Sequence, residues 1–323
     1  MKKIFLMLLV ICGLISAQPK KEIPRDTSFS LGSTMAKVYK QFPTAKLVES
    51  KLPDGVEEQR NIVYTAYGDR DLHLDIFTPK QKGKLYPGVI LIHGGGWRSG
   101  YRQMEIPMAQ FLAAKGYVTA TVEYRLSIEA LYPAAVNDLK IAVRWMRANA
   151  VKYNIDTNKI AVYGCSAGGQ LAALVGTTNG IMHFENYSIY FKHSSNVQAV
   201  VDVDGVVDMT DPNESGKDTI PGKPSAGMLW FGATYNERRD LWTEASPINY
   251  VNEKTPPILF VNSSIPRYHA GRDEMIRKLN SYNVYSEVHT IPNTPHPFWL
   301  FHPWFDQAAH LIWKFLDRVF KGK

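Results

Sequence analysis

One stretch, 160–174, constrains the fold of this chain more than any other: Ile-Ala-Val-Tyr-Gly-Cys-Ser-Ala-Gly-Gly-Gln-Leu-Ala-Ala-Leu. Its apolar start at 160–163 predicts a short buried strand, and residues 170–177 have helical spacing and helix-forming side chains. Between them, 164–168 form a Gly-x-Ser-x-Gly turn. In such a turn the serine backbone is strained, and the flanking small residues let neighbouring chain approach closely. The helix N-terminus then directs free N–H groups and the positive end of its dipole to the same place.

A second motif strengthens the interpretation of this turn. Gly-x-Ser-x-Gly alone is common by chance, but here a strand precedes it and a helix follows it. Upstream, the continuous apolar run 89–92 is typical of a strand covered on both faces, and it leads into His-Gly-Gly-Gly-Trp at 93–97. We therefore expect Ser166 to be a catalytic nucleophile.

The alternation of strands and helices predicts the fold class. The expected strands are 60–67, 72–77, 89–92, 117–122, 160–163, 197–203, 257–261 and 285–290. The expected helices are 106–115, 133–149, 170–177, 273–281 and 304–320. This order implies an α/β fold with a mostly parallel, doubly wound sheet of about eight strands and helices on both faces. Ligands bind at the carboxyl ends of such strands, and the residues that follow strand ends here are the stretch 94–97, Ser166, Asp204, Arg267 and His296.

Length alone allows one large or two small domains. The chain has 323 residues, 45% of them hydrophobic, which is ample for a core. We expect an extended N-terminal lead-in at 18–58 and a catalytic domain at 59–323, with a lid-like insertion at 206–254, because long loops are often lids or binding elements. The formal charge of +7 comes without a Lys/Arg block interleaved with aromatic residues, so no nucleic-acid partner is expected.

Residues 1–17 have the pattern of a signal peptide. Lys2 and Lys3 precede an apolar run at 4–14, and Ala17 offers a small residue for cleavage. The run is too short to span a membrane, and no other long apolar run occurs, so stable membrane insertion is not expected. We therefore expect the protein to be secreted or periplasmic.

The two cysteines have different expected fates. Cys12 raises the question of lipid modification, but Ile11 before it is bulkier than such a site normally takes, so soluble export is favoured. After removal of the signal only Cys165 remains, and no intramolecular disulfide is possible. Cys165 is expected to be a small buried packing residue rather than a reactive thiol.

Several motifs together resemble one known family. They are His-Gly-Gly-Gly-Trp at 93–97, Glu-Tyr-Arg-Leu at 123–126, the helix start at 133–138, Gly-Cys-Ser-Ala-Gly-Gly at 164–169 and Pro-His at 295–296. In this order they resemble the α/β-hydrolase superfamily, and within it the carbohydrate-esterase branch related to bifunctional feruloyl and acetyl-xylan esterases, over residues 60–320. The resemblance implies an oxyanion hole formed by the backbone N–H groups of Gly95, Gly96 and Ala167.

The resemblance also implies that Ser166 is the nucleophile and His296 the general base, and the residues agree. A serine hydroxyl is a poor nucleophile until a base takes its proton. Of the nine histidines, His296 lies in a short loop after the last expected strand, in the chain order of serine followed by histidine. The others lie on the near-side strands or lack a partner motif.

The third member of the triad is where the chain departs from this family. The resemblance implies an aspartate a few residues after the strand ending at 261, but that position falls near Pro266. Asp204, which closes the preceding strand, and Asp273, which opens a helix, are the alternatives. Asp273 has a ready structural explanation as a helix N-cap or a partner of Arg272. Position therefore favours Asp204, with Asp273 as the alternative acid.

The same segment brings cationic side chains to the active-site edge: Arg267, His269 and Arg272. Arginine suits bidentate binding of a carboxylate, as on a uronate polymer such as pectin. Alternatively, these residues pair with nearby carboxylates and only brace the loop. Aromatic faces on which sugars stack are offered by Trp97 and Trp230, and further by Trp242, Trp299 and Trp304, although most tryptophans simply pack.

The resulting hypothesis is an exported serine esterase that acts on acetyl, methyl or feruloyl esters of plant cell-wall polysaccharides. Its partner is then a polysaccharide or oligosaccharide ester. No cofactor or metal is expected, because no His/Cys/Asp cluster has ligand spacing. The alternatives are a general carboxylesterase or lipase-like enzyme, a peptidase on the same fold, and a non-catalytic sugar-binding protein.

Overall fold

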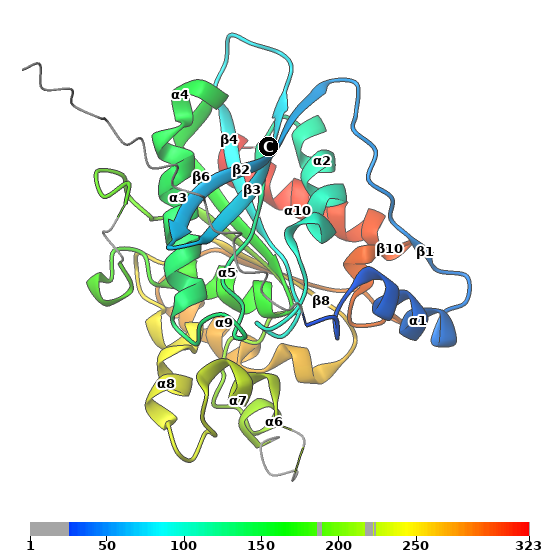
Figure 1. The fold of residues 1–323 in the computed structure, drawn as a ribbon, viewed down its shortest axis with the longest axis vertical. Coiled ribbons are helices and arrows are strands. Elements are labelled where there is room, and N and C mark those ends of the chain that lie inside the picture. The colour runs from blue at the N-terminus through cyan, green and yellow to red at the C-terminus, as the bar shows by residue number, and fades with distance from the viewer. Residues whose placement is uncertain (1–25, 186–188, 217–221, 223, 323) are drawn as a thin grey trace, which may run out of the picture.

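The structure, a computed structural model, describes residues 26–185, 189–216, 222 and 224–322 (Figure 1). The expected signal peptide at 1–17 and Cys12 lie outside the described residues. No helix within the described ranges is long and apolar enough to cross a membrane.

The centre of the molecule is an eight-stranded sheet with the order β2-β3-β5-β4-β6-β7-β8-β9. Its strands are β2 (Val56–Tyr67), β3 (Arg70–Pro79), β4 (Tyr86–Ile92), β5 (Val118–Val122), β6 (Ile155–Cys165), β7 (Ala199–Val203), β8 (Ile258–Asn262) and β9 (Ser286–Thr290). The pairs β2–β3 and β3–β5 are antiparallel, and all later pairs are parallel. The predicted mostly parallel sheet of about eight strands is confirmed.

Both faces of the sheet are buried at its central strands, as the apolar run in β4 predicts. Ile90 and Ile92 pack into one apolar cluster, whereas Val89 and Leu91 pack into the other. The first cluster includes side chains of α3 (Ala134–Ala148), α5 (Ala167–Thr177) and α9 (Arg272–Ser281). The second includes side chains of α2 (Ile106–Ala114) and α10 (Trp304–Lys321). Alternate residues of a strand point to opposite faces, so a strand between two helical layers is apolar throughout.

The prediction of an extended lead-in at 18–58 is wrong for part of that range. Residues 31–41 form helix α1 (Leu31–Gln41), β1 (Lys46–Leu47) pairs with β10 (Phe301–His302), and β2 already begins at residue 56. The helix starts with a capping box, because the side chains of Ser30 and Ser33 each accept a hydrogen bond from the other's backbone N–H. This box uses serine where glutamate or glutamine is usual, so its pattern is easily missed.

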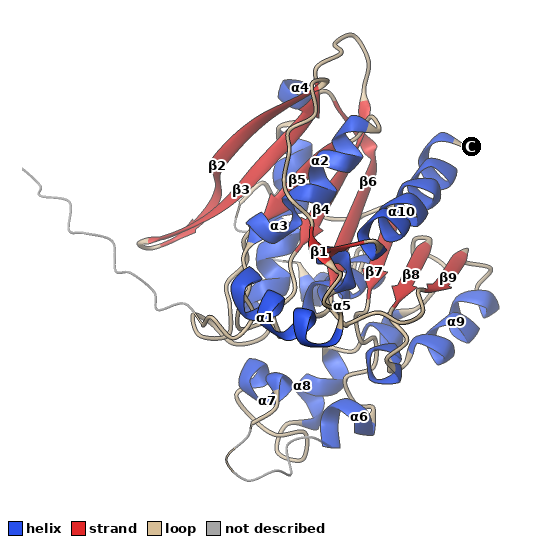
Figure 2. Cartoon of the chain, turned by 90° about the vertical axis from the view of Figure 1, so that its right-hand side faces the viewer, coloured by secondary structure: helices blue, strands red, loops and turns tan. Residues whose placement is uncertain are grey.

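In its described parts, the segment 206–254 forms short helices rather than a single long loop. They are α6 (Pro212–Ser215), α7 (Ala226–Phe231), α8 (Arg239–Glu244) and the 3-10 helix η4 (Pro247–Tyr250). Another short 3-10 helix, η5 (Pro266–His269), follows β8. Figures 1 and 2 show α6, α7 and α8 gathered at one end of the molecule, beyond the sheet. This segment therefore lies where it can cover one edge of the sheet.

Candidate active site

The nucleophile candidate lies in a tight turn between β6 and α5. Ser166 has a backbone φ of 55° and ψ of −122°, a conformation that costs a non-glycine residue about 1–3 kcal/mol. A Cβ at Gly164 would lie 1.9 Å from the carbonyl oxygen of Gly168, and one at Gly168 would lie 2.2 Å from that of Ile92. The turn is therefore possible only with glycine at both positions, and it lifts the serine hydroxyl out of the sheet.

Three side chains from separate loops form a hydrogen-bonded chain. The Nε2 atom of His296 lies 2.8 Å from the hydroxyl oxygen of Ser166, and its Nδ1 atom lies 2.9 Å from Oδ2 of Asp204. Since a carboxylate only accepts hydrogen bonds, this arrangement selects the tautomer with the proton on Nδ1. The free Nε2 lone pair then faces the serine hydroxyl, which is the geometry a general base needs.

Asp204 is held by the neighbouring strand end, and the alternative acid is not near the histidine. The Oδ1 atom of Asp204 accepts a hydrogen bond from the backbone N–H of Ser263 at 2.7 Å. Asp204 also has a positive φ of 52°, which turns its side chain at the end of β7. Asp273, by contrast, is 71% exposed and pairs with Arg272. Of the two predicted acids, the structure brings only Asp204 to His296.

The environment keeps His296 neutral. Burial lowers the pKa of His296 below its ordinary value, and this effect outweighs the hydrogen bond and charge of Asp204, which raise it. A neutral imidazole at neutral pH can accept the serine proton. His93, another histidine at this edge, is buried, and burial lowers its pKa to about 4. Its Nδ1 atom lies 2.8 Å from the carbonyl oxygen of Gly94, so His93 belongs to the glycine loop.

Backbone N–H groups are available beside the serine. Gly95, Gly96 and Ala167 line the same cleft as Ser166. Among the described residues, no hydrogen bond uses the N–H groups of these three. The loop packs directly on Ser166, since a Cβ at Gly94 would lie 3.1 Å from Cβ of Ser166. One donor aimed at a developing oxyanion contributes about 3 kcal/mol to transition-state stabilisation.

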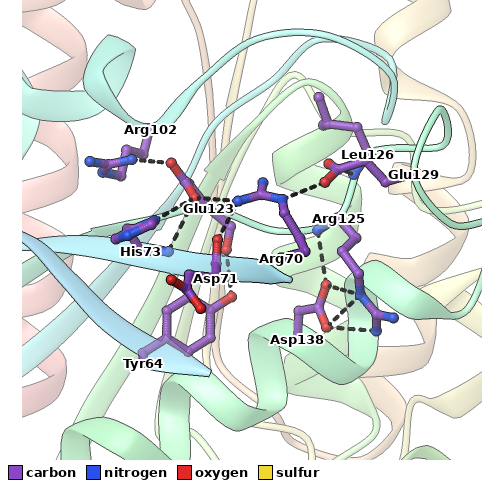
Figure 3. A network of polar contacts seen from close by, with 10 residues as sticks. All are labelled: Tyr64, Arg70, Asp71, His73, Arg102, Glu123, Arg125, Leu126, Glu129 and Asp138. Carbon is purple, nitrogen blue, oxygen red and sulfur yellow. Dashed lines mark hydrogen bonds and ion pairs between the residues drawn. The ribbon is translucent and has the colours of Figure 1, made fainter. Parts of the chain in front are cut away.

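The segment 123–126 supports that loop, and Figure 3 shows the ion pairs that hold it. The carboxylate of Glu123 pairs with the guanidinium groups of Arg102 and Arg70. It also accepts a hydrogen bond from the backbone N–H of His73 at 3.1 Å. These contacts tie the end of β5 to β3 and to the chain that follows the glycine loop.

From this fixed segment, two hydrogen bonds reach the glycine loop. The hydroxyl of Tyr124 donates to the carbonyl oxygen of His93 at 3.0 Å, and the backbone N–H of Ser127 donates to that of Trp97 at 2.8 Å. The ring of Tyr124 also stacks on that of His93. The loop is thus fixed at both ends before a substrate arrives, which is what electrostatic preorganisation requires.

The cleft at the serine has a volume of about 490 Å³ and draws its walls from distant parts of the chain. Its lining includes the candidate triad and the glycine loop. The N-terminal stretch contributes Asp26, Ser28 and Phe29; the segment 206–254 contributes Glu214, Pro224, Ala226 and Leu229; and the loop after β8 contributes Arg267 and Tyr268. Within the described ranges, no group of three or more His, Cys, Asp or Glu side chains is placed to hold a metal ion.

Of the predicted cationic binding residues, only Arg267 lines the cleft. Its Nε and Nη2 atoms lie 2.8 and 3.2 Å from the two carboxylate oxygens of Glu214. Arg272 pairs with Asp273, and the ring of His269 is hydrogen-bonded to the carbonyl oxygen of residue 263. The structure therefore corrects the grouping of these residues as substrate ligands: Arg272 and His269 brace the loop, because their polar atoms already have protein partners.

The two predicted sugar platforms are packed against each other. The rings of Trp97 and Trp230 stack with centroids 4.6 Å apart, and the side chains are 4% and 1% exposed. The indole N–H of Trp97 donates to the side chain of Gln170 at 2.9 Å. The prediction for Trp230 is thus corrected, because a buried ring has no face for a sugar. Trp97 does line the cleft.

Sequence reasoning missed three features of the cleft. The ring of Tyr268 stacks on that of His296, with centroids 3.5 Å apart and an interplanar angle of 6°. Glu214 and the N-terminal residues Asp26 and Phe29 also line the cleft. The sequence contained a signal for Tyr268, since this residue lies in the segment from which the usual acid is absent. The others had none, because they reach the cleft only through the tertiary fold.

Cys165 directly precedes Ser166 in the chain and is fully buried. Burial raises the pKa of its thiol well above the usual range. Its neighbour Glu105 is also buried, and burial raises the pKa of that carboxyl to about 8. A protonated, inaccessible thiol is a packing group and not a nucleophile.

The family model described as BD-FAE matches residues 74–287, more than half of the chain. The esterase LipC of Mycobacterium tuberculosis is 32% identical over 201 residues, which cover 61% of this chain and 49% of that relative. The chain thus spans about half the length of the curated relatives it matches.

Two solved structures share the fold. One is described as a truncated form of a carbohydrate esterase from gut microbiota, with a TM-score of 0.68 and 26% identity, covering 83% of this chain and 99% of that one. The other is described as a bifunctional GH43-CE of Bacteroides eggerthii, with a TM-score of 0.69 and 27% identity, covering 81% of this chain and 38% of that one. The family match and these structures together show that the chain has the α/β-hydrolase fold.

Proposed function

The chain belongs to the BD-FAE family, and from this premise we propose that it is an exported serine esterase that hydrolyses acetyl, methyl or feruloyl esters on plant cell-wall polysaccharides. The observation that carries the proposal is the hydrogen-bonded chain from Asp204 through His296 to Ser166, at 2.9 and 2.8 Å, beside unused backbone N–H groups. The carbohydrate part of the proposal is supported by the solved carbohydrate-esterase structures that share this fold.

In this mechanism the oxygen of Ser166 attacks the ester carbonyl carbon while Nε2 of His296 takes the hydroxyl proton. The carbonyl oxygen becomes an oxyanion, which the N–H groups of Gly95, Gly96 and Ala167 stabilise. As the tetrahedral intermediate collapses, the bond to the alcohol breaks, and His296 gives its proton to the leaving oxygen. Water, deprotonated by the same histidine, then attacks the acyl-serine and releases the acid.

Asp204 acts on the histidine and not on the substrate. Its carboxylate accepts the Nδ1 proton, which keeps Nε2 free to act as base, and it stabilises the imidazolium that forms during attack. Ser263 donates to the other carboxylate oxygen, so the carboxylate cannot rotate away. The proposal thus places the triad acid at the end of β7, whereas the family resemblance indicates the end of the next strand, β8.

A second candidate substrate class is an ester on an acidic polymer such as pectin. It is favoured by one observation, the guanidinium group of Arg267 in the cleft wall, whose side chain is 40% exposed. The proposed export rests on the signal-peptide pattern of residues 1–17. Expression of the full chain in a bacterial host and N-terminal sequencing of the exported product tests it, and retention of Met1 would contradict it.

The central test is Ser166→Ala, assayed on a small aryl acetate and on acetylated, methylated and feruloylated polysaccharides. We expect the variant to fold with an unchanged melting temperature and to release acid or alcohol only at the background rate. Ser281→Ala, an exposed serine on α9, is the matched control and should keep full activity. An unchanged aryl-acetate rate in Ser166→Ala would reject the nucleophile, and the polysaccharide panel identifies the ester.

A further inference from the structure

An N-terminal stretch forms one wall of the catalytic cleft. We call residues 26–29 the N-terminal wall; Asp26, Ser28 and Phe29 of this wall line the cleft that contains Ser166. The family match begins only at residue 74. This wall therefore comes from a part of the chain that the family model does not match.

The wall is attached to the glycine loop. Asp26 forms a parallel β-bridge with Ser99, and its carboxylate pairs with Nε of Arg98 at 2.8 Å. The hydroxyl groups of Ser28 and Ser99 are 3.3 Å apart. Ser99 in turn donates, from its backbone N–H and its hydroxyl, to the carbonyl oxygen of Gly95 at 2.9 Å each. The wall thus continues the loop that supplies the proposed oxyanion hole.

The other end of the wall is anchored in the core. Helix α1 starts directly after it, capped by Ser30, and the side chains of Phe29 and Leu31 pack against the second apolar cluster. Hydrogen bonds from Ser28 and the charge of Arg98 lower the pKa of Asp26, so its carboxylate is ionised at neutral pH. A wall held at both ends presents its polar groups in fixed positions, which lowers the ordering cost of binding.

The charges around the cleft are compensated in pairs. Asp26 pairs with Arg98 on one side, and Glu214 pairs with Arg267 on the other. Glu214 is nearly buried, so withdrawing Arg267 toward a substrate carboxylate would remove the ion-pair partner of a desolvated charge. The cleft is consequently better matched to a neutral ligand than to a uronate.

The polar and apolar groups of the wall match a sugar ring. A pyranose or furanose presents hydroxyl groups at its edge and C–H groups on its faces. The carboxylate of Asp26 accepts hydrogen bonds, the Arg98 guanidinium donates them, and the Ser28 hydroxyl does both. Phe29 adds an aromatic surface beside them. A cleft with an apolar lining and a few fixed polar groups is typical of a specific small-molecule site.

We propose that the N-terminal wall, together with Arg98, is the subsite that binds the neutral sugar carrying the ester. This proposal rests on the proposed esterase function and narrows its substrate to esters of uncharged carbohydrates. The wall contributes binding of the sugar and not chemistry at the carbonyl carbon. Its removal therefore affects sugar esters more than small esters that do not reach it.

The test compares Phe29→Ala and Asp26→Asn with the wild type on acetylated xylo-oligosaccharides and on 4-nitrophenyl acetate. For each variant we expect kcat/KM on the sugar ester to fall about tenfold more than on the aryl ester, mainly through KM, because remote binding is lost. The control is Leu52→Ala, which removes an exposed apolar side chain from the same N-terminal region, outside the cleft. It should leave kcat/KM unchanged on both esters. Melting temperatures show whether each variant folds. If Phe29→Ala does not fold, Asp26→Asn still tests the proposal, because asparagine keeps the size of the aspartate side chain.

The outcomes separate the two proposals. A wild type that hydrolyses neither ester rejects the esterase function, and the subsite with it. A wild type that hydrolyses the aryl ester and prefers partly methyl-esterified oligogalacturonate over the neutral sugar ester rejects the subsite alone. Equal losses on both esters in the two wall variants also reject the subsite, because they indicate a wall that only supports the glycine loop.

Discussion

The loops after β7 and β8 leave the sheet side by side, but they serve the histidine in different ways. The strands are paired in parallel register, with Val203 opposite Val261. The β7 loop supplies the carboxylate of Asp204, and the β8 loop supplies the backbone N–H of Ser263 that holds it. The comparison shows that neighbouring parallel strands present equivalent positions, so a carboxylate on either can reach the same imidazole.

The β8 loop uses its remaining length for an aromatic and an ionic contact. Tyr268 stacks on His296, and Arg267 reaches across to Glu214 on α6. The segment in which the family resemblance placed an acid therefore packs a ring against the imidazole and ties the segment 206–254 to the sheet. Four variants test this division between the two loops, from the largest expected effect to the smallest.

Asp204→Asn is expected to have the largest effect. The asparagine side chain keeps the size of the carboxylate but favours the wrong histidine tautomer, which has lowered turnover about 10⁴-fold in a comparable triad. We expect kcat on a small aryl acetate to fall by this order, with little change in KM or melting temperature. A loss of less than about tenfold would show that the β7 loop does not carry the acid.

Tyr268→Leu is expected to have the next largest effect. Leucine keeps the site apolar but removes the ring whose face stabilises the imidazolium, by about 0.5–2 kcal/mol. We expect kcat to fall about 2- to 30-fold. The acid limb of the pH profile should also move to lower pH, because the charged form of His296 loses stabilisation.

The pH profile separates this effect from a structural one. In the wild type the acid limb should lie below the ordinary histidine value, since burial lowers the pKa of His296. The charged groups that face the ring are Asp204 and Glu214, which raise this pKa, and Arg267, which lowers it; all three remain in the variant. Tyr268→Phe keeps the ring and should keep the limb in place. A limb that moves in both variants, or in neither, contradicts the proposed role.

Glu214→Gln is expected to have a smaller and substrate-dependent effect. It leaves the charge of Arg267 without its carboxylate partner in the cleft wall. We expect KM for partly methyl-esterified oligogalacturonate to fall about threefold at low ionic strength and to return toward the wild-type value in high salt. A neutral sugar ester should show no such salt dependence. An unchanged KM for the acidic substrate at low salt would mean that the Arg267–Glu214 pair does not control selectivity for charge.

The sequence predicts those parts of the site that depend on local constraints. A Cβ at residue 164 or 168 would lie 1.9 or 2.2 Å from a backbone oxygen, so the turn requires the two glycines that the sequence motif contains. The apolar run in β4 likewise predicts its burial on both faces. The order of strands and helices could therefore be predicted from the sequence, and the eight-stranded sheet agrees with that prediction.

The parts that could not be predicted depend on contacts between distant segments. Ser28 and Ser99 meet across 71 residues, and no local pattern indicates that the N-terminal wall reaches the cleft. Position in the sequence favours Asp204 over Asp273, but the contact that holds its carboxylate, from the backbone N–H of Ser263, follows only from the pairing of β7 with β8. Trp230 has the composition of a sugar platform, and only the packing of the short helix α7 shows that its ring is covered.

Asp273→Asn is expected to have the smallest effect of the four and completes the comparison of the two loops. Its carboxylate is 71% exposed and pairs with Arg272 at 2.8 Å on the solvent side of α9. An exposed ion pair contributes about 0–1 kcal/mol to stability, so the melting temperature should change little. Because Asp273 does not contact His296, we expect kcat and the pH profile on the aryl acetate to match the wild type, in contrast to Asp204→Asn. A loss of turnover in Asp273→Asn comparable to that in Asp204→Asn would return the acid to the β8 side of the sheet, where the family resemblance first placed it.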